Sequence, residues 1–384
     1  MPKYKMSEIA VEITERENSP AKSSYKKFVG LEHYDSGEVR ISKFGDTSKL
    51  ESTMKVFQEG DVLIARRNVY LKRAGVVNFS GLTSGDSIVL RPKNDIFGKI
   101  LPFILNTEEF WHFAEQYSDG TMSKRLSPKI LMEYEFVLPE EKELETLCDT
   151  LWAAYETKES YYELLKNTDE LVKSQFIEMF GDCVNGWKHN TVVFDSIAQF
   201  TTGGTPAHKD KKEYVGDIPW VTTVALGKNY IYKSDAVSYI SQKAIDESAT
   251  HLIDENSLMI GIRVGVGKAS VNKVKMCTSQ DVLSVHNINS KYNVLFLKAV
   301  TDSYSDFFDA NKRGATIKGI PSTLIRGLSI PDVDRCMQDE YVNILTQTDK
   351  SKVNLQKGLK RLENTKNMII QSFSNERRIK NAYV

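Results

Sequence analysis

The sequence predicts an α+β protein with an internal pseudo-two-fold repeat, in which two mixed α/β modules are separated by two long antiparallel helices that pair as a coiled coil. Three observations predict this fold. Segments recur along the chain at a nearly constant offset, each half contains a long charged stretch with heptad spacing, and a proline precedes that stretch in both halves. The expected order is a module at 1–139, a helix at 140–180, a second module at 181–332, and a distal helix with a tail at 333–384.

The repeat is clearest where "LLKNTDELVKSQF" at 164–176 is matched by "RLENTKNMIIQSF" at 361–373. Other matches occur in the same order in both halves at offsets of 192 to 196 residues: 59–67 with 255–263, 86–90 with 281–285, 119–126 with 313–320, and 136–144 with 328–336. Each match alone is weak, but matches in one order at a nearly constant offset indicate a duplication. We therefore expect both modules to share one fold.

The two charged stretches follow Pro139 and Pro331 and have the spacing of helices. Apolar and small residues recur at alternating steps of three and four, which defines a seam from Leu144 to Met179 and another from Tyr341 to Ser372 that includes Gly358. A single such helix is equally typical of a core helix or of a homodimeric coiled coil. Because the helix occurs twice, antiparallel pairing within one chain is favoured.

The length of the first seam fits a spacer. At about 1.5 Å per residue, the seam corresponds to a rod of about 54 Å. Two half-sites one DNA turn apart are separated by roughly 34 Å. Such a rod is long enough to hold two modules one turn apart.

Composition indicates a globular protein whose nucleic-acid binding, if any, is local. The chain of 384 residues has 41% hydrophobic and 27% charged residues, and its 51 basic and 51 acidic residues give a net charge of zero. A DNA partner would therefore require basic residues gathered on one face. We find no signal-peptide core and no apolar run long enough for a membrane span. The four cysteines are widely spaced, which favours a reducing cytoplasm.

Enzyme motifs are absent from the sequence. The segment "GIRVGVGKAS" at 261–270 matches neither a nucleotide-triphosphate loop nor a dinucleotide loop, because Ala269 and Ser270 stand where those patterns need other residues. The six histidines have no zinc spacing, and no GxSxG elbow occurs. We expect a non-catalytic chain without a metal or cofactor of its own.

Basic loops follow a buried-strand pattern at matching places in both halves. Arginine suits bidentate contact with guanine, and lysine suits phosphate. The alternative is a solvated turn between two strands. The candidate DNA-binding residues in these loops are Arg66, Arg67, Tyr70, Lys72 and Arg73 in the first half, and Arg263, Lys268 and Lys273 in the second.

Other loops combine hydroxyl, glycine and basic residues that suit phosphate or base contacts, although ordinary polar surface loops have the same composition. These candidates are Thr201, Thr202, Gly203, Gly204, Thr205, Lys209, Lys211, Lys212, Thr222, Thr223, Lys228, Tyr230, Lys312, Arg313, Thr316 and Lys318, with Lys124 and Arg125 as first-half counterparts of the last group.

The motifs "TTGGTP", "IPWVTT", "LMIGIRVGVGKAS" and "RGATIKGIPSTLIRGLSIP" occur in this order in the second half, which resembles the specificity subunit of type I restriction–modification enzymes. The resemblance extends over the whole chain through the repeat. The first module departs from it, because "RNVYLK" stands where the second has "RVGVGK" and the GGTP stretch is missing.

This resemblance implies that each module is a target-recognition domain that reads one half of a bipartite, asymmetric site on double-stranded DNA. The paired helices would set the gap between the halves and dock two methyltransferase subunits, through which restriction and translocase subunits assemble. S-adenosylmethionine and ATP would belong to those partners. Two alternatives stay open: a two-module coiled-coil scaffold that binds proteins and not DNA, and an enzyme whose site is assembled only on folding.

Overall fold

In this computed structural model, residues 2–120, 123–206, 215–314 and 318–380 are described, with side chains through residue 369. The predicted mixed α/β content and a long helix, α5 (Glu141–Phe180), are confirmed. The described residues form two compact units: unit 1 contains residues 1–162 and 356–384, and unit 2 contains residues 163–355. Each long helix therefore contributes to both units.

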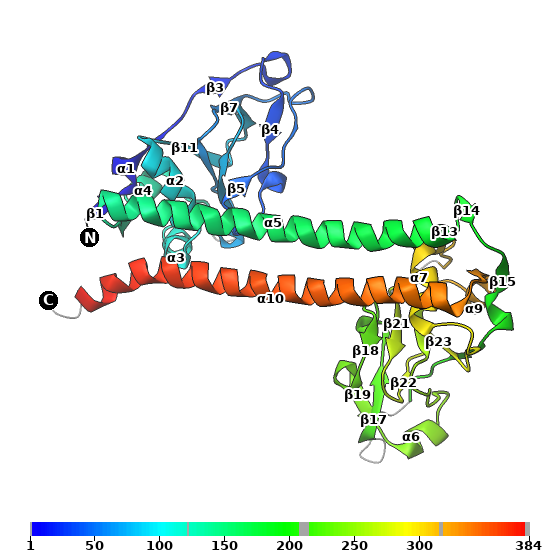
Figure 1. Ribbon diagram of the computed structural model, residues 1–384. Helices are drawn as coiled ribbons and strands as arrows, with labels where there is room; N and C mark the ends of the chain where they lie inside the picture. The colour runs from blue at the N-terminus through cyan, green and yellow to red at the C-terminus, as the bar shows by residue number, and fades with distance from the viewer. Residues whose placement is uncertain (1, 121–122, 207–214, 315–317, 381–384) are drawn as a thin grey trace. The chain divides into compact units, whose positions relative to one another are not determined.

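Unit 1 is built around a sheet with strand order β2-β11-β8-β9-β5 (Figure 1). Neighbouring strands pair antiparallel except β9 and β5, which are parallel. The strands are β2 (Ala10–Glu12), β11 (Ser87–Pro92), β8 (Val62–Ala65), β9 (Ala74–Val77) and β5 (Arg40–Ile41). The strand β8 reads "VLIA" and is buried on both faces, as expected for a central strand covered on each side.

A second sheet in unit 1 has the order β3-β7-β10-β4-β6, and β1 pairs with β12. These strands are β3 (Arg16–Glu17), β7 (Met54–Phe57), β10 (Gly81–Thr83), β4 (Lys27–Val29), β6 (Gly45–Asp46), β1 (Lys3–Lys5) and β12 (Glu135–Val137). The short helices are α1 (Met6–Ile9), η1 (Pro20–Lys22), η2 (Leu31–His33), η3 (Val69–Leu71), α2 (Asp95–Ile104), α3 (Glu108–Gln116) and α4 (Pro128–Met132).

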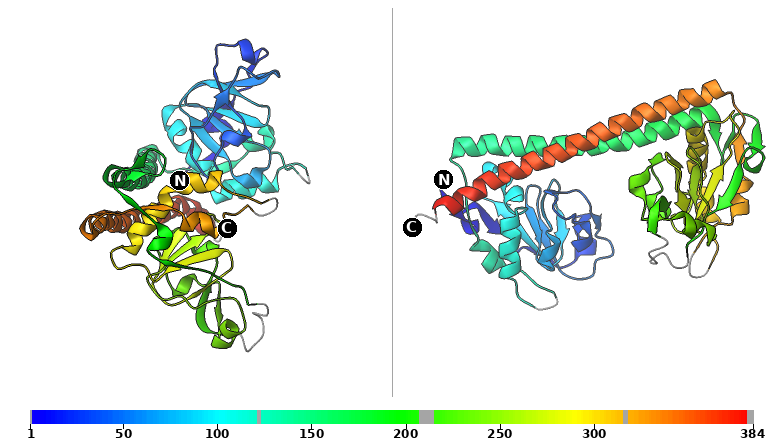
Figure 2. Two further views of the ribbon diagram at one scale, coloured as in Figure 1. Left: turned by 90° about the vertical axis from the view of Figure 1, so that its right-hand side faces the viewer. Right: turned by 90° about the horizontal axis from the view of Figure 1, so that it is seen from below.

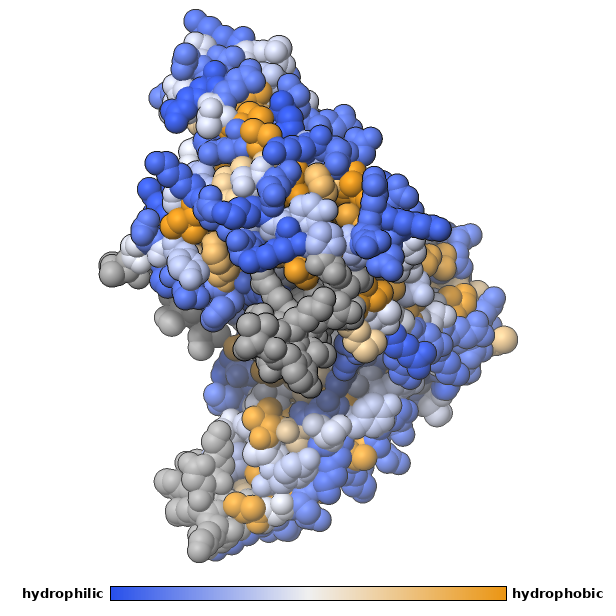
Figure 3. Space-filling model, turned by 90° about the vertical axis from the view of Figure 1, so that its left-hand side faces the viewer, coloured by the Kyte–Doolittle hydropathy of each residue, from blue (hydrophilic) through white to orange (hydrophobic). Residues whose placement is uncertain are grey.

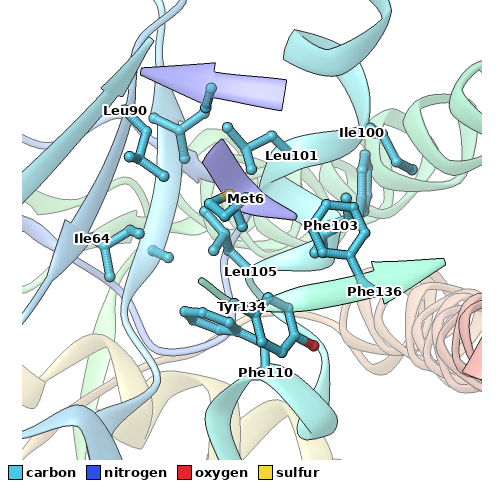
Figure 4. Packing of buried hydrophobic residues seen from close by; sticks show 14 of the residues in the cluster. Met6, Ile64, Leu90, Ile100, Leu101, Phe103, Leu105, Phe110, Tyr134 and Phe136 are labelled. Atoms are coloured by element: carbon cyan, nitrogen blue, oxygen red, sulfur yellow. The ribbon is translucent and has the colours of Figure 1, made fainter. Parts of the chain in front are cut away.

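The main core of unit 1 lies between the first sheet and its helices (Figure 4). Phe110 and Trp111 of α3 are almost fully buried there, and Tyr134 packs on Phe110 with ring centroids 5.2 Å apart. Full burial of one such side chain stabilises the fold by about 1.5–3 kcal/mol. The first turns of α5 join this core, so the helix is anchored to the unit by its own apolar residues.

Unit 2 repeats the first sheet strand for strand. Its order is β16-β23-β20-β21-β18, again antiparallel except for the last, parallel pair. These strands are β16 (Gln199–Thr202), β23 (Val282–His286), β20 (Leu258–Gly261), β21 (Ala269–Asn272) and β18 (Tyr230–Ile231). The matching order and directions agree with the duplication predicted from the sequence.

The second sheet of unit 2, β19-β17-β22, corresponds only in part to that of unit 1. The strands of this sheet are β19 (Ser238–Ile240), β17 (Val215–Val221) and β22 (Cys277–Thr278). The remaining described elements of the unit, besides the long helices, are β13 (Gly181–Asp182), β14 (Gly186–Trp187), β15 (Thr191–Val193), η4 (Phe194–Ser196), η6 (Thr223–Ala225), η7 (Lys233–Asp235), α6 (Gln242–Asp246), α7 (Val294–Ser303), α8 (Ser305–Ala310), α9 (Ser322–Arg326) and β24 (Ser329–Pro331). In the core, Phe296 of α7 packs on Phe180 of one long helix, and Phe180 in turn packs on Tyr341 of the other.

The ends of α5 have recognisable signals. Glu141 and Glu143 lie in its first turn, where the positive end of the helix dipole favours carboxylates. The helix ends before Gly181, whose φ of 84° is left-handed. A Cβ at this glycine would lie 2.4 Å from the carbonyl oxygen of Gly186, so the stop requires glycine.

Within each unit, α5 and α10 (Arg335–Lys380) run antiparallel (Figures 1 and 2). In unit 2, Phe176 packs on Tyr341, and Lys352 pairs with Asp169. In unit 1, Gly358 faces Tyr161. Residue numbers thus rise on one helix as they fall on the other, as expected for antiparallel pairing.

The surface is mainly polar. On the face drawn in Figure 3, hydrophilic residues cover most of the surface and apolar residues form small separate patches. Every described helix is too short or too polar to span a bilayer.

Candidate nucleic-acid interface

An arginine and an aspartate meet at one corner of the sheet in unit 1. Arg67 follows the end of β8, and Asp86 directly precedes β11. Because these strands pair antiparallel, with Ala65 opposite Ser87, the end of β8 and the start of β11 lie side by side, and the two side chains are close together. Arg67 Nη1 lies 3.6 Å from Asp86 Oδ2, and the backbone N–H of Arg66 donates to the Asp86 carbonyl at 2.9 Å.

Unit 2 contains the same corner. Arg263 comes soon after β20, and Asp281 directly precedes β23. Arg263 Nη1 lies 3.6 Å from Asp281 Oδ1, and the backbone N–H of Ile262 donates to the Asp281 carbonyl at 2.9 Å. The sequence analysis named both arginines but missed both aspartates. The signal was present, since the matched segments "DSIVL" and "DVLSV" both begin with aspartate.

A third segment completes each corner. In unit 1, Leu126 N–H donates to the Arg66 carbonyl at 2.9 Å, and Arg125 Nη2 lies 3.4 Å from Asp86 Oδ1. Asp86 therefore faces two arginines, Arg67 and Arg125. A pocket of about 470 Å³ lies at this corner and is lined by Arg66, Arg67, Asp119, Gly120, Ser123 and Arg125.

The third segment of unit 2 has the same backbone pairing with different side chains. Ile320 N–H donates to the Ile262 carbonyl at 2.8 Å, and Arg313 and Gly319 exchange backbone hydrogen bonds as Asp119 and Arg125 do in unit 1. Glycine thus replaces the second arginine. A Cβ at Gly319 would lie 2.8 Å from the Ile262 carbonyl oxygen, so this corner leaves no room for a side chain there.

Not every basic candidate in unit 1 is available to a ligand. Arg73 donates from Nη1 to the Leu31 carbonyl at 2.9 Å and from Nη2 to the Arg67 carbonyl at 3.2 Å, and burial lowers its pKa. This guanidinium holds the loop together, and its role as a DNA contact stays a prediction. Lys72 pairs with Glu108 at 2.6 Å, and Lys124 donates to the Glu115 carbonyl at 2.9 Å.

Two other candidates of unit 1 differ in their surroundings. The Tyr70 side chain is exposed and has no structural task in the core. Arg66 is half-buried, and its Nε has no hydrogen-bond partner. Among the described candidates of unit 1, Arg67, Tyr70 and Arg125 therefore offer the most accessible contacts.

In unit 2, two glycine-containing loops meet beside Arg263. A Cβ at Gly227 would lie 3.6 Å from Cδ of Lys268, and Ser270 Oγ accepts from Gly227 N–H at 3.1 Å while donating to the Lys228 carbonyl at 2.6 Å. Gly265 and Gly267 have left-handed φ angles of 62° and 81° and give the loop its turn. Lys268 is exposed and ends the same loop that begins with Arg263, because its carbonyl accepts from Gly261 N–H at 2.9 Å.

The neighbouring candidates are already paired or buried. Lys228 forms an ion pair with Asp235. Lys273 Nζ lies 4.4 Å from the centre of the Tyr230 ring, and burial raises the pKa of Tyr230. Thr223 is buried, whereas Thr222 is half-buried.

The Thr-Thr-Gly-Gly-Thr stretch has a packing role that the sequence did not reveal. A Cβ at Gly203 would lie 2.3 Å from the Thr278 carbonyl oxygen, and the Gly204 carbonyl accepts from Trp220 Nε1 at 3.0 Å. Both glycines allow close approach to protein backbone, and their role in approaching DNA stays a prediction. The Thr201 hydroxyl is 2.8 Å from His286 Nε2, while Thr202 and Thr205 are exposed.

The last candidates lie near the third segment of unit 2. Lys312 forms an ion pair with Asp309, and Arg313 and Lys318 are exposed. Lys209, Lys211, Lys212 and Thr316 lie outside the described residues. Among the residues with described positions, no three His, Cys, Asp or Glu side chains are placed to share a metal ion.

The fold and these corners define a class of protein with two duplicated α/β units, each built partly from both long helices. Comparison with known proteins shows what the chain is similar to. Residues 186–364 match the type I restriction modification DNA specificity domain. This match and two named relatives confirm the resemblance to type I specificity subunits that the sequence indicated.

Two relatives have known names. The chain is 25% identical over 157 residues to the type I restriction enzyme MjaIX specificity subunit of Methanocaldococcus jannaschii, covering 40% of this chain and 36% of the relative. It is 30% identical over 175 residues to the type I restriction enzyme EcoR124I/EcoR124II specificity subunit of Escherichia coli, covering 43% and 42%. The chain thus spans about two fifths of the length of the relatives it matches.

Solved structures share the fold over nearly the whole chain. A structure described as the basis of complex assembly and conformational transition of the type I R-M system has a TM-score of 0.60 at 16% identity, covering 97% of both chains. The S subunit of the type I restriction–modification system from M. genitalium has a TM-score of 0.56 at 12% identity, covering 97% of this chain and 95% of that one.

Proposed function

We propose that this chain is the DNA sequence-specificity subunit of a type I restriction–modification complex, and that each α/β unit reads one half of a bipartite, asymmetric site. The repeated arginine–aspartate corner carries this proposal. The same exposed arginine stands at the same edge of the same sheet in both units, with 43% of the Arg67 side chain and 51% of the Arg263 side chain accessible. Arginine at a sheet edge suits bidentate contact with guanine.

The neighbouring residues suit the DNA backbone. Lys268 is exposed and belongs to the same loop as Arg263, and a lysine ammonium contacts phosphate as a point charge. Because the net charge of the chain is zero, binding would depend on these local groups and not on a general positive field.

The long helices have the features of a spacer with docking surfaces. In our proposal they set the gap between the two halves of the site and bind two methyltransferase subunits, which in turn bring restriction and translocase subunits. Several large apolar side chains on these helices are exposed, which suits protein contacts. They are Tyr162, Leu164 and Leu171 of α5, and Val353 and Met368 of α10.

The chain itself would be non-catalytic and cytoplasmic in this proposal. S-adenosylmethionine and ATP would be bound by its partners. This division of tasks is consistent with a surface whose basic residues are arranged for recognition and with the family that residues 186–364 match.

The test is to co-express the chain with its methyltransferase partner and to map methylated bases across a genome. The expected result is a split motif with a constant gap. Arg263→Ala should relax discrimination at one half by about 1–3 kcal/mol and leave the other half unchanged. Methylation without a split motif would contradict the proposal, and binding of partner proteins without any binding of DNA would favour the scaffold alternative.

A further inference from the structure

The two corner aspartates are unexpected on a surface that contacts DNA. A carboxylate there repels phosphate, so it opposes the binding that the neighbouring arginine favours. Asp86 and Asp281 nevertheless occupy the same place in both units, with 29% and 30% of their side chains exposed. The presence of an acidic side chain at both positions therefore needs an explanation other than the fold.

The turn that contains each aspartate uses its backbone and not its carboxylate. In unit 1, Ser87 N–H donates to the Ser84 carbonyl at 3.1 Å, and in unit 2, Val282 N–H donates to the Ser279 carbonyl at 3.0 Å. The carbonyls of Asp86 and Asp281 accept the N–H groups that follow β8 and β20. Any residue with the same backbone would make these contacts, so the turn does not require an acidic side chain.

The geometry of the corner pairs differs from that of a structural pair in the same unit. Arg91 donates from Nε and Nη2 to the two oxygens of Asp61 at 2.8 Å each, and the Asp61 side chain is only 1% exposed. Such a bidentate pair occupies the guanidinium. At the corners, the separations between arginine Nη atoms and aspartate oxygens are longer, at 3.4 to 3.6 Å. Arg67 also donates from Nε to Ser123 Oγ at 2.9 Å, so in unit 1 its Nη N–H groups are the ones that stay available to a ligand.

We propose that Asp86 and Asp281 are positioning residues that determine specificity: each holds the corner arginine toward base edges and weakens its attraction to phosphate. This inference rests on the proposed function. A guanidinium held beside a carboxylate gains less from an arbitrary phosphate, while a guanine edge that matches its fork still binds it. Asp86 serves two arginines and Asp281 serves one, because Gly319 replaces Arg125 in unit 2.

The experiment compares two duplexes bound by the complete complex with its methyltransferase partner. One duplex carries the motif mapped with the wild-type complex, and the other has the half read by unit 2 scrambled. For Asp281→Asn, we expect affinity for the scrambled duplex to rise by about threefold and the ratio between the two duplexes to fall roughly tenfold. Asp86→Asn should lower the ratio only for a duplex scrambled in the other half.

Two controls separate positioning from general effects. Asp254→Asn removes the same charge from an exposed ion pair with Lys275 outside the corner, and it should leave the ratio unchanged. In an Arg263→Ala background, Asp281→Asn should have no further effect on the ratio, because the aspartate acts through that arginine.

Three outcomes would overturn the inference. In Asp281→Asn, affinities for both duplexes that equal the wild-type values would contradict it. An equal fall in affinity for both duplexes, which is what a folding defect produces, would contradict it as well. Both would leave the proposed function intact as long as the wild-type complex prefers its motif. A wild-type complex that binds both duplexes equally would instead contradict the proposed function, and the inference with it.

Discussion

Arginine has two different tasks within a few residues of this chain. The Arg67 side chain is 43% exposed, with its Nη1 beside Asp86 and its Nε bonded to Ser123 Oγ. The Arg73 guanidinium bridges the carbonyls of Leu31 and Arg67 and so ties the loop to its neighbours. The loop needs this tie because Asn68 and Lys72 adopt left-handed φ angles of 55° and 49°. The two arginines are thus expected to respond differently to replacement.

Arg73→Ala should destabilise the protein by about 1–3 kcal/mol, because it leaves two partly buried carbonyls without their donor. The midpoint of urea unfolding, followed by circular dichroism, measures this loss. Arg125→Ala is the matched control, since its exposed side chain makes only a 3.4 Å ion pair, and it should change stability by less than about 0.5 kcal/mol. Unchanged stability in Arg73→Ala together with weaker DNA binding would contradict the structural role.

Among the elements, those with a strong period were the most predictable. The long charged stretches have helical spacing and no proline, and the buried runs "VLIA" and "LMIG" became central strands. The inward face of α10 was less predictable. The steps of three and four from Tyr341 predict Ser351 and Thr365 on the inward face, yet both are exposed, and Lys352 and Lys366 are partly buried instead.

The physical reason is that the inward face of a straight helix drifts around the helix axis relative to a seven-residue repeat. A helix with 3.6 residues per turn moves by about 20° per heptad relative to a strict seven-residue pattern, so a seam extrapolated along a long helix loses register. Lysine stems are also able to cover apolar surface while the ammonium reaches a partner, as Lys352 does with Asp169. Burial lowers the pKa of Lys366 on the same face.

Gly358 marks the close approach of the two helices in unit 1. A Cβ at this position would lie 2.8 Å from Cε2 of Tyr161. In a helix interior, alanine is favoured over glycine by about 1 kcal/mol, so glycine here is explained by space and not by propensity. The contact is with a ring, which makes a test by two substitutions possible.

Gly358→Ala should destabilise the wild-type protein, because the added methyl group displaces the Tyr161 ring. In a Tyr161→Ala background, the same substitution should stabilise it by roughly 1 kcal/mol through helix propensity. Urea unfolding of the four proteins in this cycle gives both values. Stabilisation by Gly358→Ala in both backgrounds would show that the helices do not approach closely at this residue.

For the molecule as a whole, the sequence indicated which loops hold candidate recognition residues but not how those residues are arranged. The basic loops were named from composition and from their position in the repeat. The pairing of Arg67 with Asp86 depends on which strands are neighbours, and that adjacency comes from the sheet order. The packing of Gly203 against residues far along the chain is likewise invisible in a single sequence.

The duplicated units also differ in ways that, under the proposed function, suit two different half-sites. Unit 1 has an Arg67–Asp86–Arg125 corner, whereas Gly319 leaves unit 2 with Arg263 and Asp281 alone. Strands β3 and β7 have no counterpart in the described sheet of unit 2. An asymmetric site is the expected target of two readers with one fold and unequal side chains.

Exchange of residues 182–331 for the corresponding module of another family member should change one half of the methylated motif and leave both the other half and the gap intact. The exchange keeps both long helices, but the core of unit 2 crosses its boundaries, since Phe296 packs against Phe180 at 4.9 Å between ring centroids. The donor module therefore needs an aromatic residue at this place, and Phe296→Ala in the original chain is the control for loss of that anchor. Methylation mapping of the hybrid complex measures the result. A change in both halves, or a gap that varies with the donor module, would mean that recognition is not divided between the units and that the helices do not set the spacing.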